Sequence, residues 1–188
     1  MGTTVFIAGS MNIKNLDAKV IERIDNIVSK GFDVVVGDAD GADTSIQRHL
    51  FSLGDAKTTV FCSGSRPRNN VGDWPIHVVE TTHAEGTRAF FTAKDIKMAE
   101  AADYGLMIWD TKSTGTLSNV LELLARKKKS VVFVNKAKLF KNVGDVNQLE
   151  ELVAYMSEVA RRKAEDKIKL TERIEALKHE QVQVQLFA

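Results

Sequence analysis

The sequence predicts an α/β fold, a Rossmann-like parallel sheet covered by helices on both faces, with a long C-terminal helix. Short runs of β-branched residues alternate with stretches whose apolar residues recur at helical spacing. The strand runs are apolar throughout instead of alternating with polar residues, which is typical of a parallel sheet buried between two helical layers. With 188 residues, of which 44% are hydrophobic, the chain is long enough for one such domain.

Each element follows from its local pattern. Strands are expected where β-branched and aromatic residues cluster, at residues 4–8, 33–37, 58–62, 76–79, 106–109 and finally 131–134. Helices are expected at residues 16–30, 42–53, 85–102 and 116–128. Gly31 is placed to end the first of these helices.

The character of the chain changes beyond Asn147, so we divide it into a Rossmann-like domain (1–146), a C-terminal helix (147–180) and a tail (181–188) without helix support. The first part of the helix carries an apolar stripe expected to pack on the sheet, namely Leu149, Leu152, Val153, Met156, Val159 and Ala160. From residue 161 to 180 the chain holds seven Lys/Arg, five Asp/Glu and no Gly or Pro. We expect the helix to continue there as a solvated or dimer-forming extension.

Composition excludes several classes of protein. The 26 Lys and Arg residues nearly balance 25 Asp and Glu, which is unlike a protein that coats nucleic acid or an acidic disordered chain. No apolar run approaches the ~18 residues of a membrane span, and the first residues lack a secretion signal. Cys62 is the single cysteine, so no internal disulfide forms. We expect a cytoplasmic protein without membrane contact.

No cofactor or metal is expected either. The four histidines lack the spacing of a zinc site, and the acidic run that begins at Asp38 lacks the Gly and Glu positions of a calcium-binding EF-hand loop.

Three turns follow strands at the edge of the sheet where ligands bind in open parallel sheets. Each turn combines Gly with hydroxyl or carboxylate groups directly before a helix. The first turn contains Gly9 and Ser10, and the second contains Gly37, Asp38, Asp40, Gly41 and Asp43. The third contains Asp110, Ser113, Thr114, Gly115 and Thr116. Gly allows close approach of a ligand, and a helix N-terminus offers free N–H groups to an anion. The alternative is that these residues only form turns and helix caps. Three such turns on one edge favour a nucleotide-like ligand.

The charges of the turn residues indicate which part of a nucleotide each turn would bind. The carboxylates of Asp38, Asp40 and Asp43 would repel a phosphate, so they suit ribose hydroxyls, a base N–H or helix capping. Phosphate is expected at the turn of residues 113–116, whose donors carry no opposing charge. Arg88 and Lys94 lie on a helix that can add positive charge, although a solvated helix face also accounts for them.

The motifs together resemble the SLOG superfamily of Rossmann-like proteins, within it the YspA-like branch. Similarity covers residues 4–135 and rests on residues 7–10, residues 37–43, residues 98–103 and the pair Trp109-Asp110 followed by Ser-Thr-Gly-Thr at 113–116. The resemblance implies binding of a nucleotide or nucleotide-derived ligand. Relatives in that superfamily include cytokinin-activating phosphoribohydrolases of the LOG type, nucleoside deoxyribosyltransferases and the DNA-processing protein DprA.

Departures from the family pattern separate two functions. Met11 stands where the family commonly has arginine, and Asn119 stands where the deoxyribosyltransferases carry their nucleophilic Glu. The sequence therefore favours a sensor or adaptor module that binds a nucleotide. The alternative is an enzyme, an N-glycoside hydrolase or deoxyribosyltransferase-like protein acting on nucleotides, with Asp40 or Glu122 as the catalytic carboxylate.

Two further segments suggest macromolecular partners. Residues 126–141 hold seven Lys/Arg and no Asp or Glu, which suits either nucleic acid contact or a helix end whose dipole attracts cations. The tail residues Gln183, Leu186 and Phe187 fit the pattern Gln-x-x-Leu-Phe, which resembles the motif that docks bacterial replication and repair proteins on the sliding clamp. The tail could equally pack on its own domain or on a dimer mate as an edge strand.

Overall fold

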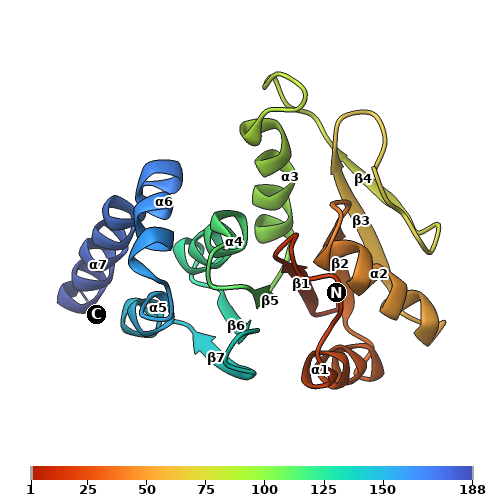
Figure 1. Cartoon of the computed structure of the whole chain (residues 1–188), viewed down its shortest axis with the longest axis horizontal. Coiled ribbons are helices and arrows are strands. Elements are labelled where there is room, and N and C mark those ends of the chain that lie inside the picture. Colours follow the sequence, from red (N-terminus) through yellow and green to blue (C-terminus); the bar gives the residue numbers. More distant parts are fainter. Residues whose placement is uncertain (1, 188) are drawn as a thin grey trace.

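One seven-stranded sheet forms the centre of the computed structural model, which describes residues 2–187 (Figure 1). The order of its strands is β4-β3-β2-β1-β5-β6-β7. Their bounds are β1 Thr4–Gly9, β2 Asp33–Gly37, β3 Thr58–Ser63, β4 Ile76–Val79, β5 Tyr104–Trp109, β6 Lys129–Val134 and β7 Leu139–Val143. The α/β class with a mostly parallel sheet is thus confirmed.

Helices cover both faces of the sheet, but unequally. The helices are α1 Ala18–Ser29, α2 Ala42–Leu53, α3 Arg88–Ala101, α4 Thr114–Ala125, α5 Val146–Val153, α6 Glu158–Ile168 and α7 Leu170–Phe187. On one face Ile24 of α1 and Ile46 of α2 pack with Ile7 of β1. The opposite face carries α3 to α7 in one continuous apolar cluster, which includes Leu117 of α4 and Leu149 of α5.

The strand order reverses between β1 and β5. The chain runs outward from β1 through β2 and β3 to β4, then returns through α3 to place β5 on the other side of β1. All neighbouring strands are parallel except β6 and β7. In open sheets of this kind, the crevice outside the carboxyl ends of the two strands at the reversal is where ligands bind. The topology therefore directs attention to the turns after β1 and β5.

Strand β7 was not predicted, since we expected residues 131–134 to form the last strand. Residues 139–143 pair antiparallel with β6, so that Phe140 lies beside Phe133 with the two ring centroids 5.0 Å apart. Lysine and asparagine interrupt this strand, as is common at the edge of a sheet, and its hydrophobic signal is correspondingly weak.

The predicted long C-terminal helix is present as α7, but one helix over residues 147–180 is wrong in detail, because the chain forms three helices from residue 146 onward. α5 ends near Ala154, and Ser157 then begins α6 by accepting a hydrogen bond from the N–H of Ala160. Most of the predicted stripe is buried, but Val159 is 76% exposed. The break puts Val159 in the first turn of α6, on the side away from the sheet.

The second break lies at Lys169, which adopts the left-handed conformation (φ 54°, ψ 51°). This turn allows Ile168 and Leu170 both to be buried, although they would point in nearly opposite directions on a straight helix. Glu165 stabilises the turn, since its Oε2 accepts hydrogen bonds from the N–H and the hydroxyl of Thr171 at 3.0 and 2.7 Å.

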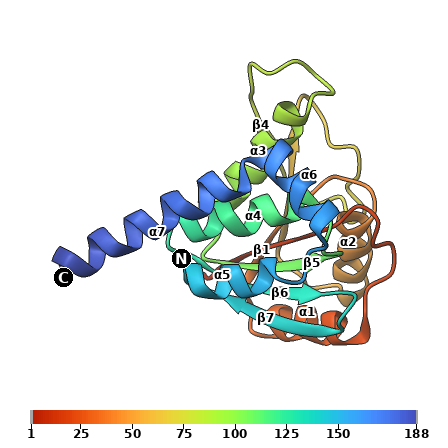
Figure 2. The same cartoon turned by 60° about the vertical axis from the view of Figure 1, so that its left-hand side comes forward.

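The tail is also helical, contrary to prediction. α7 continues to Phe187 and projects beyond the body of the protein (Figure 2). The tail forms no edge strand, and Leu186 and Phe187 at its end are exposed, whereas Gln181 at its start accepts a hydrogen bond from the N–H of Val146 at 3.4 Å. No helix among residues 2–187 combines the length and the apolar character that crossing a membrane requires.

The left-handed turn at Lys169 predicts that replacing lysine by glycine changes the free energy of unfolding in opposite directions at two nearby exposed positions, 169 and 167. Lys169→Gly should raise the free energy of unfolding by about 0.5–1 kcal/mol, because Gly adopts the left-handed conformation without a Cβ clash. Lys167→Gly, inside the last turn of α6, should lower it by about 1 kcal/mol. Urea unfolding of both variants measures the two effects, and a loss of stability in both would contradict the turn.

Candidate functional site

Hydrogen bonds join the turns that follow β1 and β5. The hydroxyl of Ser10 accepts a hydrogen bond from the N–H of Asp110 at 3.1 Å and lies 3.2 Å from the hydroxyl of Thr116. The N–H of Ser10 donates to the carbonyl of Ile108 at 2.9 Å. The predicted first and third turns therefore meet at the strand-order reversal, with Ser10 and Thr116 buried between them.

The first turn of α4 presents hydrogen-bond donors. Ser113 is its N-cap, and Asp110 Oδ1 accepts from the N–H groups of Lys112 and Ser113 at 2.9 and 2.6 Å. Ser113 Oγ accepts from the N–H of Thr116 at 3.4 Å. The N–H groups of Thr114 and Gly115, as the first two residues of the helix, have no intrahelical partner. They and the helix dipole make this turn suitable for an anion.

A cation stands beside that turn. Arg88, in the first turn of α3, donates from Nη2 to the hydroxyl of Thr114 at 3.1 Å. Its side chain is exposed, so the guanidinium keeps further donors for a ligand. Arg88 is the one predicted basic residue that the structure brings to the predicted phosphate turn.

Asp38, at the end of β2, is already engaged. Its carboxylate accepts from Arg68 Nη2 at 2.9 Å, Arg68 Nε at 3.2 Å and the N–H of Arg68 at 2.9 Å. Burial alone would raise the pKa of Asp38, but the hydrogen bonds from Arg68 and the charge of Lys94 outweigh it and hold the pKa below its usual value. Asp38 therefore orders the loop after β3 instead of offering a free acceptor for ribose.

Lys94 lies in the interior, not on a solvated helix face. Its ammonium is 2.8 Å from Asp95 Oδ1 and 3.9 Å from Asp38 Oδ1. Burial would lower the pKa of Lys94, yet the charges of Asp95, Asp43 and Asp38 raise it, so the side chain stays positive. It links α3 to the end of β2 and is not directed at the phosphate turn.

The other two aspartates of the second turn differ in environment. Asp43 is buried and accepts from the N–H of Ala39 at 3.3 Å, and its burial raises its pKa to about 6 despite the nearby charge of Lys94. Asp40 is exposed and accepts from Asn69 Nδ2 at 3.0 Å. Of the three predicted acidic residues, only Asp40 faces solvent at this edge.

Two glycines are required for this packing. A Cβ on Gly37 would lie 2.4 Å from Asp43 Oδ2 and 2.8 Å from Lys94 Nζ. A Cβ on Gly41, whose φ is +77°, would lie 2.0 Å from the carbonyl oxygen of Met11. These glycines allow the turn after β2 to close on the buried charges and on the turn after β1; Gly9 likewise approaches Ala42 of α2.

Glu122 lies apart from the three turns. Its carboxylate is bound by two arginines: Arg173 of α7 donates to Oε1 at 2.7 Å, and Arg126 donates to Oε2. Glu122 thus connects α4 to α7, and its oxygens are occupied by these ion pairs. The enzymatic alternative requires either Asp40 or Glu122 as the catalytic carboxylate. The oxygens of Glu122 are occupied, whereas Asp40 is exposed at the carboxyl edge of the sheet.

The loop after β3 supplies site residues that sequence reasoning missed. Arg68 packs over the ring of Phe91 at 4.4 Å, and Asn69 Nδ2 donates to the carbonyl of Asp38 at 2.9 Å. Gln47 of α2 donates to the carbonyl of Gly37 at 2.8 Å and accepts from the N–H of Val71 at 2.9 Å. The density of Arg and Asn in residues 64–72 was the available signal, since such residues bind carboxylates and exposed carbonyls.

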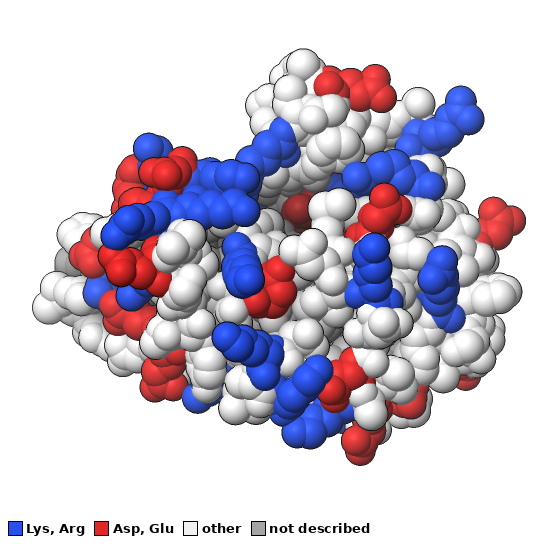
Figure 3. Space-filling model, viewed as in Figure 1, with Lys and Arg blue, Asp and Glu red and all other residues white. Residues whose placement is uncertain are grey.

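Several basic side chains of residues 126–141 form hydrogen bonds or ion pairs with other parts of the chain. Lys128 donates to the carbonyls of Ala99 and Glu100 at 2.8 and 2.7 Å, and Lys138 lies 3.2 Å from Asp17. Arg126 pairs with Glu122. Lys and Arg alternate with Asp and Glu on the face shown in Figure 3. These contacts support the structural interpretation of the stretch.

The larger hollows lie at the opposite edge of the sheet. One of about 630 Å³ is lined by the first residues of β5 and β6, and one of about 620 Å³ by the first residues of β2 and β3. Among residues 2–187, no group of three His, Cys, Asp or Glu side chains is arranged to hold a metal. The candidate site is consequently an open set of donors, defined by hydrogen bonding and charge.

Comparison with known proteins adds no assignment: no protein-family model, curated protein or solved structure matches this chain. The SLOG resemblance accordingly stays a prediction, and functional argument rests on the geometry of the site.

The raised pKa of Asp43 predicts a pH-dependent effect of Asp43→Asn. Asp43 binds its proton more tightly in the folded state (pKa about 6) than in the unfolded state (about 3.9), so its contribution to stability falls as pH rises from about 4 through 6. The difference in free energy of unfolding between Asp43→Asn and wild type should therefore shift by roughly 2–3 kcal/mol in favour of Asp43→Asn between pH 4 and pH 8.

Urea unfolding across this range measures that gain. The exposed Asp55→Asn is the matched control and should follow the wild-type profile. If the stability difference between Asp43→Asn and wild type is constant with pH, Asp43 does not titrate as the structure indicates.

Proposed function

We propose that this protein binds a nucleotide or nucleotide-derived ligand at the carboxyl edge of its sheet, as a sensor or adaptor module. The observation that carries the proposal is the contact of Arg88 with Thr114 at the first turn of α4, directly at the strand-order reversal. A guanidinium and two free helix N–H groups converge there, which is the chemistry that recognises phosphate.

The neighbouring surface suits the remainder of a nucleotide. Met11 follows Ser10 in the turn after β1, and its exposed side chain offers an apolar surface for a base. Asp40 is the exposed carboxylate of the second turn and can accept from a ribose hydroxyl. The hydroxyls of Ser10 and Thr116 contact each other in the interior and stabilise the turn.

Binding without catalysis is favoured by the state of the carboxylates. Asp38 and Glu122 are neutralised by arginines, and Asp43 is buried behind Gly37. A carboxylate that attacks a sugar or activates water must reach the ligand. These three are paired or buried, and Asp40 is the exposed acidic residue of the second turn that remains for the enzymatic alternative.

Gly115→Asp provides a test that leaves the fold intact. Gly115 is exposed, and a Cβ there would meet only Ser113 Oγ, at 3.9 Å. An Asp at this second helical position complements the helix dipole, so the variant should fold as well as wild type. Its negative charge should nevertheless weaken nucleotide binding at least about tenfold, which corresponds to about 1.4 kcal/mol.

Thermal unfolding and calorimetry with a panel of purine and pyrimidine mono-, di- and triphosphates measure the effect. Nucleotides should raise the melting temperature of wild type and of the control Gly115→Ala, because a ligand that binds only the folded state stabilises it. Arg88→Gln should lose affinity as Gly115→Asp does. The proposal fails if no member of the panel binds wild type, or if Gly115→Asp binds with wild-type affinity.

A further inference from the structure

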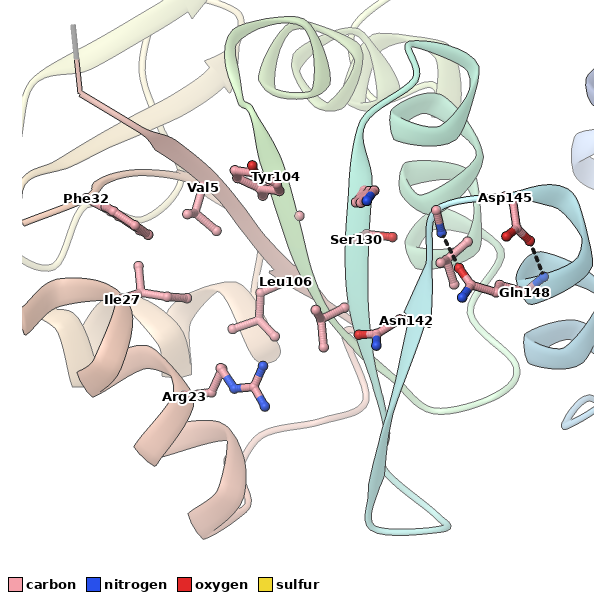
Figure 4. Close-up of a pocket in the computed structure, with 15 residues that line it drawn as sticks. Val5, Arg23, Ile27, Phe32, Tyr104, Leu106, Ser130, Asn142, Asp145 and Gln148 are labelled. Atoms are coloured by element: carbon pink, nitrogen blue, oxygen red, sulfur yellow. Dashed lines mark hydrogen bonds between the residues drawn. The ribbon is translucent and has the colours of Figure 1, made fainter. Parts of the chain in front are cut away.

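One apolar groove lies where the sheet has no helix above it. On the face covered by α1 and α2, strands β5, β6 and β7 extend beyond these helices and leave a hollow of about 630 Å³ (Figure 4). Its floor is apolar and includes Leu106, Val131 and Ile27, and the exposed ring of Tyr104 lies at its rim. The charged side chains of Arg23, Lys129 and Asp145 also line it. We call this hollow the sheet groove.

The end of α7 is the second unpartnered apolar surface. Leu170, Ile174 and Leu177 form the stripe by which α7 packs on the body. Val182 and Leu186 are one helical turn apart and point away from that stripe, as does Phe187. They are 53%, 74% and 90% exposed. Val184 still faces the body, so the last two turns of the helix carry a second apolar face, directed outward and largely exposed.

Charge distinguishes this end from the rest of the helix. Residues 161–180 hold twelve charged side chains, whereas residues 181–187 hold none. We call residues 181–187 the α7 tip. A solvated extension gains from charge, while an uncharged segment with four exposed apolar side chains, Val182, Val184, Leu186 and Phe187, brings no ion of its own that docking would desolvate.

The groove and the tip lie at neighbouring places on the molecule. Where α7 leaves the body, it borders a smaller hollow lined by Leu177, Val184 and the segment Gly144–Val146. Lys129, Gly144 and Asp145 line both this hollow and the sheet groove. The helix projects from beside the groove and away from the body (Figure 2), and the exposed Leu186 and Phe187 lie at its end.

We propose that the α7 tip of one copy docks in the sheet groove of a second copy, and the reverse, in a symmetric dimer. A two-fold axis close to the segment Gly144–Val146 would place each tip across the neighbouring groove. A reciprocal exchange about a two-fold axis closes on two copies instead of continuing as a filament. Each apolar surface then covers the other.

Light scattering during size-exclusion chromatography tests the dimer. Wild type should elute with twice the 20.8 kDa mass of the chain at micromolar concentration. Leu186→Glu combined with Phe187→Glu should raise the dimer dissociation constant at least about tenfold, since it puts charge into an apolar groove. Tyr104→Glu should do the same from the groove side. Val159→Glu, which changes an equally exposed residue on α6, is the matched control and should leave the dimer intact.

Cysteine crosslinking tests which surfaces meet. Cys62 is buried and does not compete. A mixture of Tyr104→Cys protein and Leu186→Cys protein should form a disulfide-linked pair containing one copy of each, whereas either variant alone should crosslink poorly.

Four outcomes would overturn the proposal. A monomer at about 100 μM wild-type protein excludes the dimer. A dimer that survives both the tip and the groove variants uses another surface, and efficient crosslinking of Leu186→Cys alone indicates that tips pair with tips. Monomeric protein whose tip instead binds a bacterial sliding clamp, with loss of binding in Leu186→Ala plus Phe187→Ala, would assign the tip to that partner.

Discussion

The buried ammonium of Lys94 is the interaction on which the carboxyl edge of the sheet depends. A single charge in the interior is costly unless it is paired, and here Asp38, Asp43 and Asp95 surround it. These partners come from the end of β2, the start of α2 and α3 itself, so one cation holds three elements together. Arg68 then binds the far side of Asp38 and brings the loop after β3 over the same point.

This arrangement explains why acidic residues accumulate at an edge proposed to bind an anion. The carboxylates serve the interior, where they compensate Lys94 and Arg68, while the donors proposed to bind an anion belong to the first turn of α4 on the other side of β1. Separation of the two sets follows from the strand order, since β2 and β5 flank β1 from opposite sides. The acidic turn and the donor turn can consequently share one edge without opposing each other.

Sequence patterns predicted most of the sheet and its helices because they depend on local, strongly periodic signals. Residues 33–37 and 42–53 match their observed elements at both ends. The elements that the sequence did not predict depend on tertiary contacts. Strand β7 forms by pairing with β6, and the helix breaks at Lys169 because Ile168 and Leu170 both reach the core. At the site, the hydroxyls of Ser10 and Thr116 were identified by position, but the pairing of Arg68 with Asp38 joins residues 30 positions apart and leaves no local pattern.

A single topological feature connects β7, the sheet groove and the projecting α7. A crossover between parallel strands carries a helix across one face of the sheet, as α1 does between β1 and β2. The β6–β7 connection is instead a short turn between antiparallel strands, so it leaves no helix on that side. After β7 the chain places α5, α6 and α7 on the face that α3 and α4 already cover. One face of β5–β7 is then left open, while α7, at the outside of a crowded layer, extends past the body with an apolar face still uncovered. Exchange between two copies removes both exposed surfaces at once, which neither surface can achieve within one chain.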